Sequence, residues 1–178
     1  MEKIMTMKKL IKDSRVIMTE LVLPNDTNTM NNLMGGRLMH WMDIGAAIAA
    51  QRHSNRTVVT ASVDNISFGK PIRLGDVVTL TASVTRAFNS SMEIYIHVKS
   101  ENIPRGKSEV THSAFLTFVA VDQGGRPIDI AEAVPETDAE KELYAGALRR
   151  RQLRLVLAKR MKPDDATELK SLFDLTHE

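Results

Sequence analysis

The stretch from Gly35 to His53 constrains the fold more than any other part of this 178-residue chain. Two glycines introduce it, and its middle consists almost wholly of apolar or very small residues. At about 100° per residue, such residues collect on one broad helical face. They are Leu38, Met42, Gly45, Ala46, Ala49 and Ala50. A helix this apolar cannot face water, and its small side chains allow a sheet to lie close, so we predict a central, covered helix.

One acidic residue, Asp43, lies on the border of that face, beside Met39 and Ala50. An unpaired carboxylate would be costly to desolvate there. Two interpretations fit: an ordinary residue at the polar edge of the helix, or a carboxylate kept for chemistry. Spacing alone favours the ordinary interpretation, because Asp is common at the border of an amphipathic helix.

Four β-type segments follow the helix, at residues 57–68, 76–88, 91–100 and 108–122, and a shorter one at 15–24 precedes it. In the second and third of the four, apolar and polar residues alternate, which is typical of strands with one buried and one wet face. Polar connections at 88–91 and 101–107 suit hairpins, so an antiparallel meander is the simplest topology. The last segment is apolar on both faces, which indicates that both are covered. The pattern predicts an α+β hotdog fold, an antiparallel sheet wrapped around a central helix.

The two ends of the chain differ in composition from this central part. We expect a charged N-terminal leader at 1–14, the hotdog domain at 15–130 and a C-terminal helical extension at 131–178. Thr137 and Glu140 have the spacing of a capping box, which predicts an outer helix from Asp138 to about Arg160. Pro163 would stop it, and the residues beyond form either a short helix or a frayed tail.

Composition excludes several kinds of protein. With 24 basic and 22 acidic side chains the net charge is only +2, so we expect no nucleic-acid partner. The absence of cysteine removes disulfides, thiolate nucleophiles and zinc–thiolate sites. No pair of histidines has metal-binding spacing with a carboxylate, so no metal is expected. The N-terminal residues do not form a secretion signal or a membrane span, so we expect a cytoplasmic protein without membrane insertion.

A series of spaced motifs resembles a known family. These are "PNDTN", "LMGGRLMHWMD", "VVTASVDNISFGKPIRLGDVVTLTASVTRAFNSSMEI" and "FLTFVAVDQGGRPI". In this order they resemble the hotdog acyl-CoA thioesterases, including bacterial broad-specificity and cytosolic brain-type acyl-CoA hydrolases. The resemblance covers about Arg15 to Ile128. Where many relatives have glycine this chain has Asn31, the residue that best tolerates positive φ after glycine.

The resemblance implies hydrolysis of a fatty acyl-CoA substrate to free acid and CoA, with no separate cofactor. It also implies a dimer, often three dimers in a hexamer, whose site combines Asp43 of one subunit with Asn28 of the other. Asp43 would be a general base toward water, which we favour, or a nucleophile through an anhydride. Asn28 would hold water or substrate by its amide. The backbone N–H groups of Gly36 and Arg37, at the first turn of the helix, would stabilise the developing oxyanion.

The phosphates of CoA call for basic or hydroxyl-bearing groups near the mouth of the site. The candidates are Lys70, Arg73, Asn89, Ser90 and Ser91. An Asn-Ser-Ser sequence is also ordinary turn chemistry, and the run Arg149–Arg151 is best explained as a solvated helix face.

Two other functions stay open. An acyl-CoA-binding regulator would need a DNA-reading helix pair, for which the leader before Val16 is too short. A hotdog dehydratase of hydroxyacyl thioesters would need a catalytic histidine paired with a carboxylate, and His40 lies one turn before Asp43.

Overall fold

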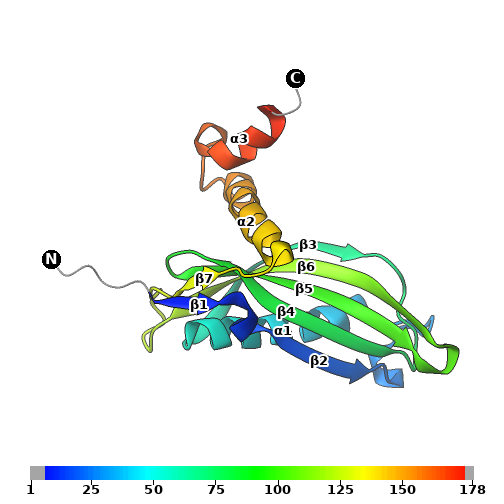
Figure 1. The fold of residues 1–178 in the computed structure, drawn as a ribbon. Coiled ribbons are helices and arrows are strands. Elements are labelled where there is room, and N and C mark those ends of the chain that lie inside the picture. Colours follow the sequence, from blue (N-terminus) through cyan, green and yellow to red (C-terminus); the bar gives the residue numbers. More distant parts are fainter. Residues whose placement is uncertain (1–6, 175–178) are drawn as a thin grey trace. The chain divides into compact units, whose positions relative to one another are not determined.

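The computed structural model describes residues 7–174, which divide after Val134 into two compact units. The first unit contains β1 (Lys8–Leu10), β2 (Val16–Leu21), α1 (Gly35–Ser54), β3 (Thr57–Phe68), β4 (Val77–Ala87), β5 (Ser91–Asn102), β6 (Lys107–Val121) and β7 (Glu132–Val134) (Figure 1). The second contains α2 (Asp138–Leu157) and α3 (Thr167–Asp174).

The main sheet has five antiparallel strands in the order β2-β4-β5-β6-β3. It curves over α1, which packs against all five strands (Figure 1). The predicted α+β hotdog arrangement is therefore confirmed. The predicted antiparallel meander is observed for β4, β5 and β6. Strand β3, which precedes them in the sequence, pairs with β6 at one edge of the sheet.

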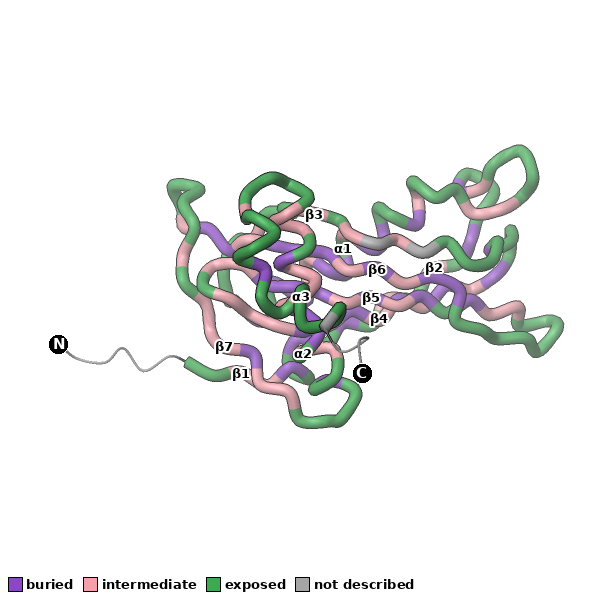
Figure 2. The backbone as a smooth tube through the Cα atoms, turned by 90° about the horizontal axis from the view of Figure 1, so that it is seen from above, coloured by how far each residue is buried: buried purple, intermediate pink, exposed green. Residues whose placement is uncertain are grey.

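The core lies between α1 and the inner face of the sheet. All six residues of the predicted helix face are buried, and the strands contribute fully buried side chains such as Leu80, Ile94, Leu116 and Phe118. Figure 2 shows buried segments, in purple, along the central strands. Each such side chain contributes roughly 1.5–3 kcal/mol by leaving water. The helix and the sheet lie close together at Gly45, where a Cβ added to this residue would lie 3.3 Å from the sulfur of Met18.

The two ends of α1 follow from local chemistry. Gly35 opens the helix after Met34, and Asn55 ends it with a left-handed φ of 52°, the conformation that Asn adopts most readily after glycine. The helix therefore ends at Ser54, one residue after the apolar stretch from Gly35 to His53.

The edge strand β3 is irregular. Its register against β6 shifts between Thr60 and Ser62 and again between Asp64 and Ser67. Such bulges bend a strand and redirect its side chains. Within the described chain, β3 pairs on one side only.

One feature near the ends of the first unit adds to the expectations. Strands β1 and β7 form a small parallel pair that the sequence did not suggest.

The outer helix α2 begins as predicted and ends earlier. Its capping box is confirmed, since the Thr137 hydroxyl accepts the Glu140 N–H at 3.2 Å and the Glu140 carboxylate accepts the Thr137 N–H. The expected end of this helix near Arg160 is wrong. Lys159 takes a left-handed φ of 56°, and the Arg160 N–H bonds back to the Leu155 carbonyl, which closes the helix at Leu157.

Candidate active site

Asp43 projects from the middle of α1 into a cavity of about 350 Å³ between this helix and β3. The lining is mainly apolar, from Met39, Met42, Val63, Ile66, Ala114 and Leu116, with Gly36, His40 and Thr60 completing it. The carboxylate is half-buried, and its Oδ1 accepts the Thr60 hydroxyl at 2.9 Å. An apolar hollow with one fixed carboxylate in its wall suits an apolar ligand with a reactive group at one end.

The Thr60 hydroxyl orients the carboxylate and leaves its second oxygen, Oδ2, to accept a proton from a ligand or water. Sequence reasoning missed Thr60, because nothing in its spacing distinguishes it from the other threonines of the strands. Its position depends on the bulge between Thr60 and Ser62, which redirects β3 beside α1. Apolar and polar residues alternate without a break from Val59 to Asp64, so the sequence carries no signal of this bulge.

Asn28 lies in the loop before α1 and lines a second cavity, of about 310 Å³. Its side-chain oxygen accepts the N–H groups of Met30 and Asn32 at 2.9 and 3.2 Å, which shapes the loop around it. The amino group of the side chain is therefore the part that can address a ligand. Asn31 has φ 57°, as the tolerance of Asn for positive φ predicts.

An ion pair fixes this loop to the start of α1. The Arg37 Nε lies 2.9 Å from Asp26 Oδ1, and the side chain of Asp26 is only 9% exposed. The other oxygen of Asp26 accepts the Leu23 N–H, and its backbone carbonyl accepts the Met34 N–H. Asp26 and the Arg37 side chain therefore join the segment that precedes Asn28 to the start of α1, a role that the sequence did not reveal.

The two amides proposed for an oxyanion differ in the structure. The Gly36 N–H donates to no backbone carbonyl of the described residues, and Gly36 lines the Asp43 cavity. The expectation that the Arg37 N–H is free is wrong: it donates to the Met34 carbonyl at 3.0 Å, because the first turn tightens onto the residue that precedes the helix. Gly36 is the better candidate of the two.

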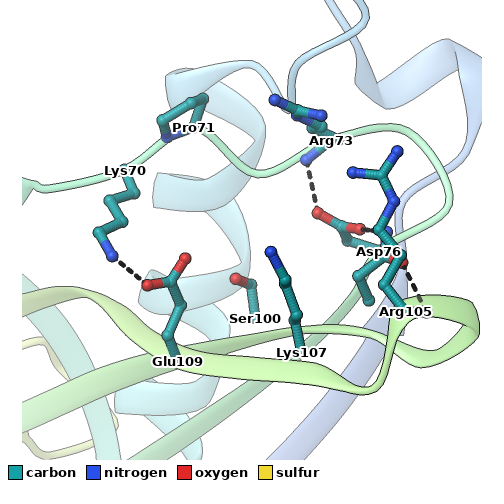
Figure 3. Close-up of a pocket in the computed structure, with 9 residues that line it drawn as sticks. Lys70, Pro71, Arg73, Asp76, Ser100, Arg105, Lys107 and Glu109 are labelled. Atoms are coloured by element: carbon teal, nitrogen blue, oxygen red, sulfur yellow. Dashed lines mark hydrogen bonds and ion pairs between the residues drawn. The ribbon is translucent and has the colours of Figure 1, made fainter.

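The candidate CoA-binding residues fall into two groups. Lys70 and Arg73 lie before β4, along a third hollow of about 300 Å³ (Figure 3). Asn89 and Ser90 lie in the turn between β4 and β5, and Ser91 is the first residue of β5. The 11 residues of β4 separate the groups. The structure does not bring the two groups together within one chain.

Asp43 and Asn28 also line different cavities, which neighbour one another along α1 and the end of β3. A single chain therefore contains both candidate residues without joining them in one site.

Three histidines bear on the site or its support. His40 lines the Asp43 cavity, but among the described residues no hydrogen bond joins it to Asp43. His112 lines the Asn28 cavity at 7% exposure with an unpartnered Nδ1, and burial lowers the pKa of its imidazole. The buried His53 ring is held by a 2.9 Å contact between its Nε2 and the Ala131 carbonyl, and burial lowers its pKa as well.

Residues 7–174 contain neither a cluster of metal-binding side chains nor a helix that could span a membrane. No three side chains of the types that bind metals gather there. None of the helices in this range has the length and apolar content to cross a membrane.

Comparison with known proteins gives a consistent result. Residues 30–107 match the model of the Thioesterase superfamily. The uncharacterized acyl-CoA thioester hydrolase YkhA of Bacillus subtilis is 44% identical over 139 residues, which are 78% of this chain and 81% of that protein. Mouse acyl-coenzyme A thioesterase 11 is 40% identical but longer, and the match spans 84% of this chain and 25% of that relative.

Solved structures agree with the sequence matches. A hexameric acyl-CoA thioesterase superposes with a TM-score of 0.83 at 39% identity, covering 85% of this chain and 97% of that one. An acyl-CoA hydrolase of Staphylococcus aureus, solved with butyryl-CoA and CoA, gives 0.80 at 36% identity, covering 86% and 95%. Variants of that enzyme with alanine in place of an aspartate, a threonine or an asparagine have also been solved.

Proposed function

Because the chain belongs to the acyl-CoA thioester hydrolases of the thioesterase superfamily, we propose that it hydrolyses fatty acyl-CoA to free fatty acid and CoA. The observation that carries the proposal is the Asp43 carboxylate, held by Thr60 in the wall of an otherwise apolar cavity. An acyl chain fits the apolar lining, and the thioester carbonyl then lies beside the carboxylate. CoA enters as part of the substrate, with no separate cofactor.

In the proposed reaction, Asp43 accepts a proton from a water molecule, and the resulting hydroxide attacks the thioester carbonyl carbon. The oxygen of the tetrahedral intermediate carries a negative charge. The Gly36 N–H and the side-chain NH2 of Asn28 donate hydrogen bonds to this oxygen. The positive end of α1 also stabilises its charge. Collapse breaks the carbon–sulfur bond, and the proton on Asp43 passes to the CoA thiolate. Removal of one oxyanion donor typically costs about 3 kcal/mol of transition-state stabilisation.

We propose that the site is shared between two subunits, Asp43 from one and Asn28 from the other. Their separation into two cavities of one chain supports this, as does the edge strand β3 beside Asp43, free to pair with a second copy. Similar structures are hexameric, so we propose a dimer that assembles further, as a trimer of dimers. The turn at Asn89, Ser90 and Ser91 would reach the ligand from another subunit. We propose a cytoplasmic location, with which the absence of cysteine is compatible.

The structure weighs against the dehydratase, which needs a histidine paired with a carboxylate. Asp43 is bonded to Thr60, and no hydrogen bond connects it with His40 in the part of the chain that the structure describes. The regulator is distinguished by turnover, since a sensor binds acyl-CoA without releasing thiol.

The test measures thiol release from palmitoyl-CoA by the purified protein and by Asp43→Ala and Asn28→Ala. We expect each substitution to abolish most turnover while the fold and assembly persist. Full activity in either variant would show that the substituted residue takes no part in the reaction. Tight binding of palmitoyl-CoA by the unsubstituted protein without thiol release would support the sensor instead.

Subunit exchange tests the sharing of the site. The two inactive variants, mixed and allowed to exchange, should regain part of the activity, because one of the two sites in each mixed dimer then has both residues. No recovery after exchange has been demonstrated by mass spectrometry would contradict a shared site.

A further inference from the structure

The apolar cavity between α1 and β3 has a deep end and an open end. Met42, Ala114 and Leu116 form its floor, since each of them is at most 2% exposed. The rim consists of exposed residues, among them Met39 and Val63, which are 41% and 42% exposed. An apolar chain that enters at the rim therefore runs inward, and its end meets the floor.

The floor is hollow because one of its residues is small. Side chains of alternate residues along β6 point to the inner face of the sheet, where Ala114 lies between His112 and Leu116. The partner of Ala114 on β5 is Ile96, which is fully buried. All three neighbours have larger side chains than alanine. A residue of their size at position 114 would fill the floor.

The edge strand β3 adds to the hollow at the same point. Its register against β6 shifts between Asp64 and Ser67, so that two residues of β3 lie across from Ala114. Ile66 is one of these two residues, and it lines the cavity. Such a bulge bends its strand and redirects the side chains on it. A small residue on one strand and a bulge on the next therefore form the deep end together.

The floor and the walls of the cavity differ in how far they can adapt to a ligand. Met39 and Met42 have unbranched side chains with three rotatable bonds, which adjust to ligands of different shape. Ala114 has no such freedom, and its strand is paired on both sides, with β5 and with β3. Its Cβ therefore stays where the sheet places it. The depth of the cavity at this point depends on the size of residue 114.

We propose that the floor receives the terminal carbons of the acyl chain and that Ala114 is a specificity-determining residue, which sets how long a chain the site accepts. This inference rests on the proposed function for its substrate. It assigns the choice of acyl group to β6, while Asp43 and Thr60 act on the thioester. One methylene group more or less in an apolar pocket changes specificity roughly 10- to 200-fold, so a small change at residue 114 is measurable.

The ratio of kcat/KM for palmitoyl-CoA to kcat/KM for butyryl-CoA tests the proposal. Ala114→Val adds two methyl groups to the floor and suits a strand, so this ratio should fall roughly 10- to 200-fold. Because both values come from one sample, a loss of folded protein lowers them equally and leaves the ratio unaffected.

The matched control is Ala120→Val. Ala120 is also fully buried on the inner face of β6, but it does not line the cavity. The substitution crowds the core in the same way and should leave the ratio unchanged. An equal ratio in Ala114→Val and the unsubstituted protein would overturn the proposal. A fall of the same size in Ala120→Val would also overturn it, because crowding of the core would then be enough.

A binding experiment without turnover makes use of the absence of cysteine. Ala114→Cys introduces the single thiol of the chain, and mass spectrometry follows its alkylation by iodoacetamide. S-hexadecyl-CoA is a thioether that cannot be hydrolysed. At ten times its Kd it should slow alkylation about tenfold by mass action, because its chain covers the floor. S-ethyl-CoA has the same CoA portion with a short chain, and it should leave the rate of alkylation unchanged.

The outcomes of this experiment separate the inference from the proposed function. Equal protection by the two thioethers, or protection by neither, would contradict the floor as the place of the acyl end. An introduced thiol that iodoacetamide does not reach in the free protein would contradict it too. If the protein released no CoA from any acyl-CoA but the long-chain thioether alone protected the thiol, the proposed function would fail and the assignment of Ala114 would stand.

Discussion

A single hydroxyl orients the carboxylate on which the proposed chemistry depends. Replacement of Thr60 by Val keeps the size and β-branching of the side chain but removes the donor to Asp43 Oδ1. A hydrogen bond to a charged group contributes about 1.5–3 kcal/mol, so we expect kcat for palmitoyl-CoA to fall roughly 10- to 100-fold. KM should change little, because the bond acts on the base and not on the substrate.

The control for that substitution is Thr60→Ser, which keeps the hydroxyl and should keep most of the activity. A fall of equal size in the serine and valine variants would show that Thr60 acts through packing. An unaffected kcat in Thr60→Val would show that Asp43 needs no positioning partner.

Buried histidines make stability depend on pH. Burial lowers the pKa of His53, and the positive charge of Lys9 lowers it further; burial also lowers the pKa of His97 and His112. As the pH falls below about 6.5, the unfolded chain takes up protons that the folded chain does not. The free energy of unfolding should therefore fall with decreasing pH in this window, by at most about 1.4 kcal/mol per pH unit for each histidine.

Chemical denaturation between pH 7.5 and 5, at constant protein concentration, measures this dependence. His53→Gln can still donate to the Ala131 carbonyl but cannot titrate, so its slope should be shallower than that of the unsubstituted protein. If His53→Gln kept the full slope, His53 would not be a source of it.

At the scale of elements, the ion pair between Asp26 and Arg37 joins the Asn28 loop to α1. Arg37→Gln leaves a nearly buried carboxylate without its charged partner, and such losses cost about 1–3 kcal/mol. We expect a melting temperature several degrees lower, together with a lower kcat, because Asn28 loses its fixed position. The combination with Asp26→Asn should cost less than the sum of the two single substitutions.

An exposed pair provides the comparison for that experiment. Lys141 and Asp138 lie 3.2 Å apart on the exposed surface of α2, so Lys141→Gln should change neither the melting temperature nor kcat. An equal response in the two variants would mean that the loss of any surface charge is enough, and the anchoring role of Arg37 would be wrong.

Elements with a strong repeating pattern were predictable, and elements fixed by tertiary contact were not. The buried face of α1, its end at Asn55 and the alternating strands β4 and β5 follow from periodicity and turn chemistry. The pair formed by β1 and β7 has three residues a strand, too few for a period to show. The end of α2 depends on Lys159 in a left-handed conformation, for which a glycine would have been the signal.

At the scale of the whole molecule, the sequence identified candidate residues but not how they are grouped. Asp43 and Asn28 were named from the family resemblance, yet they lie in separate cavities of one chain. Arg105 and Lys107 belong to a charged hairpin whose proximity to Lys70 arises only when β5 and β6 fold over the segment before β4. Long-range pairing of this kind has no local pattern, so only the folded chain reveals it.

The edge strand β3 determines whether the two halves of the proposed site can meet. Among the residues exposed in the single chain are the apolar side chains of Val59, Val63 and Phe68, and a long edge strand with apolar residues readily pairs with another copy. Val59→Lys should block this pairing by charge and shift the protein to a smaller species in sedimentation velocity. Thiol release should fall in parallel, because Asp43 then lacks the Asn28 of a partner. Ile17→Lys makes the same change on β2, the opposite edge of the sheet, and should leave the dimer intact. A Val59→Lys monomer with full activity would show that one chain suffices, and the shared site would be wrong.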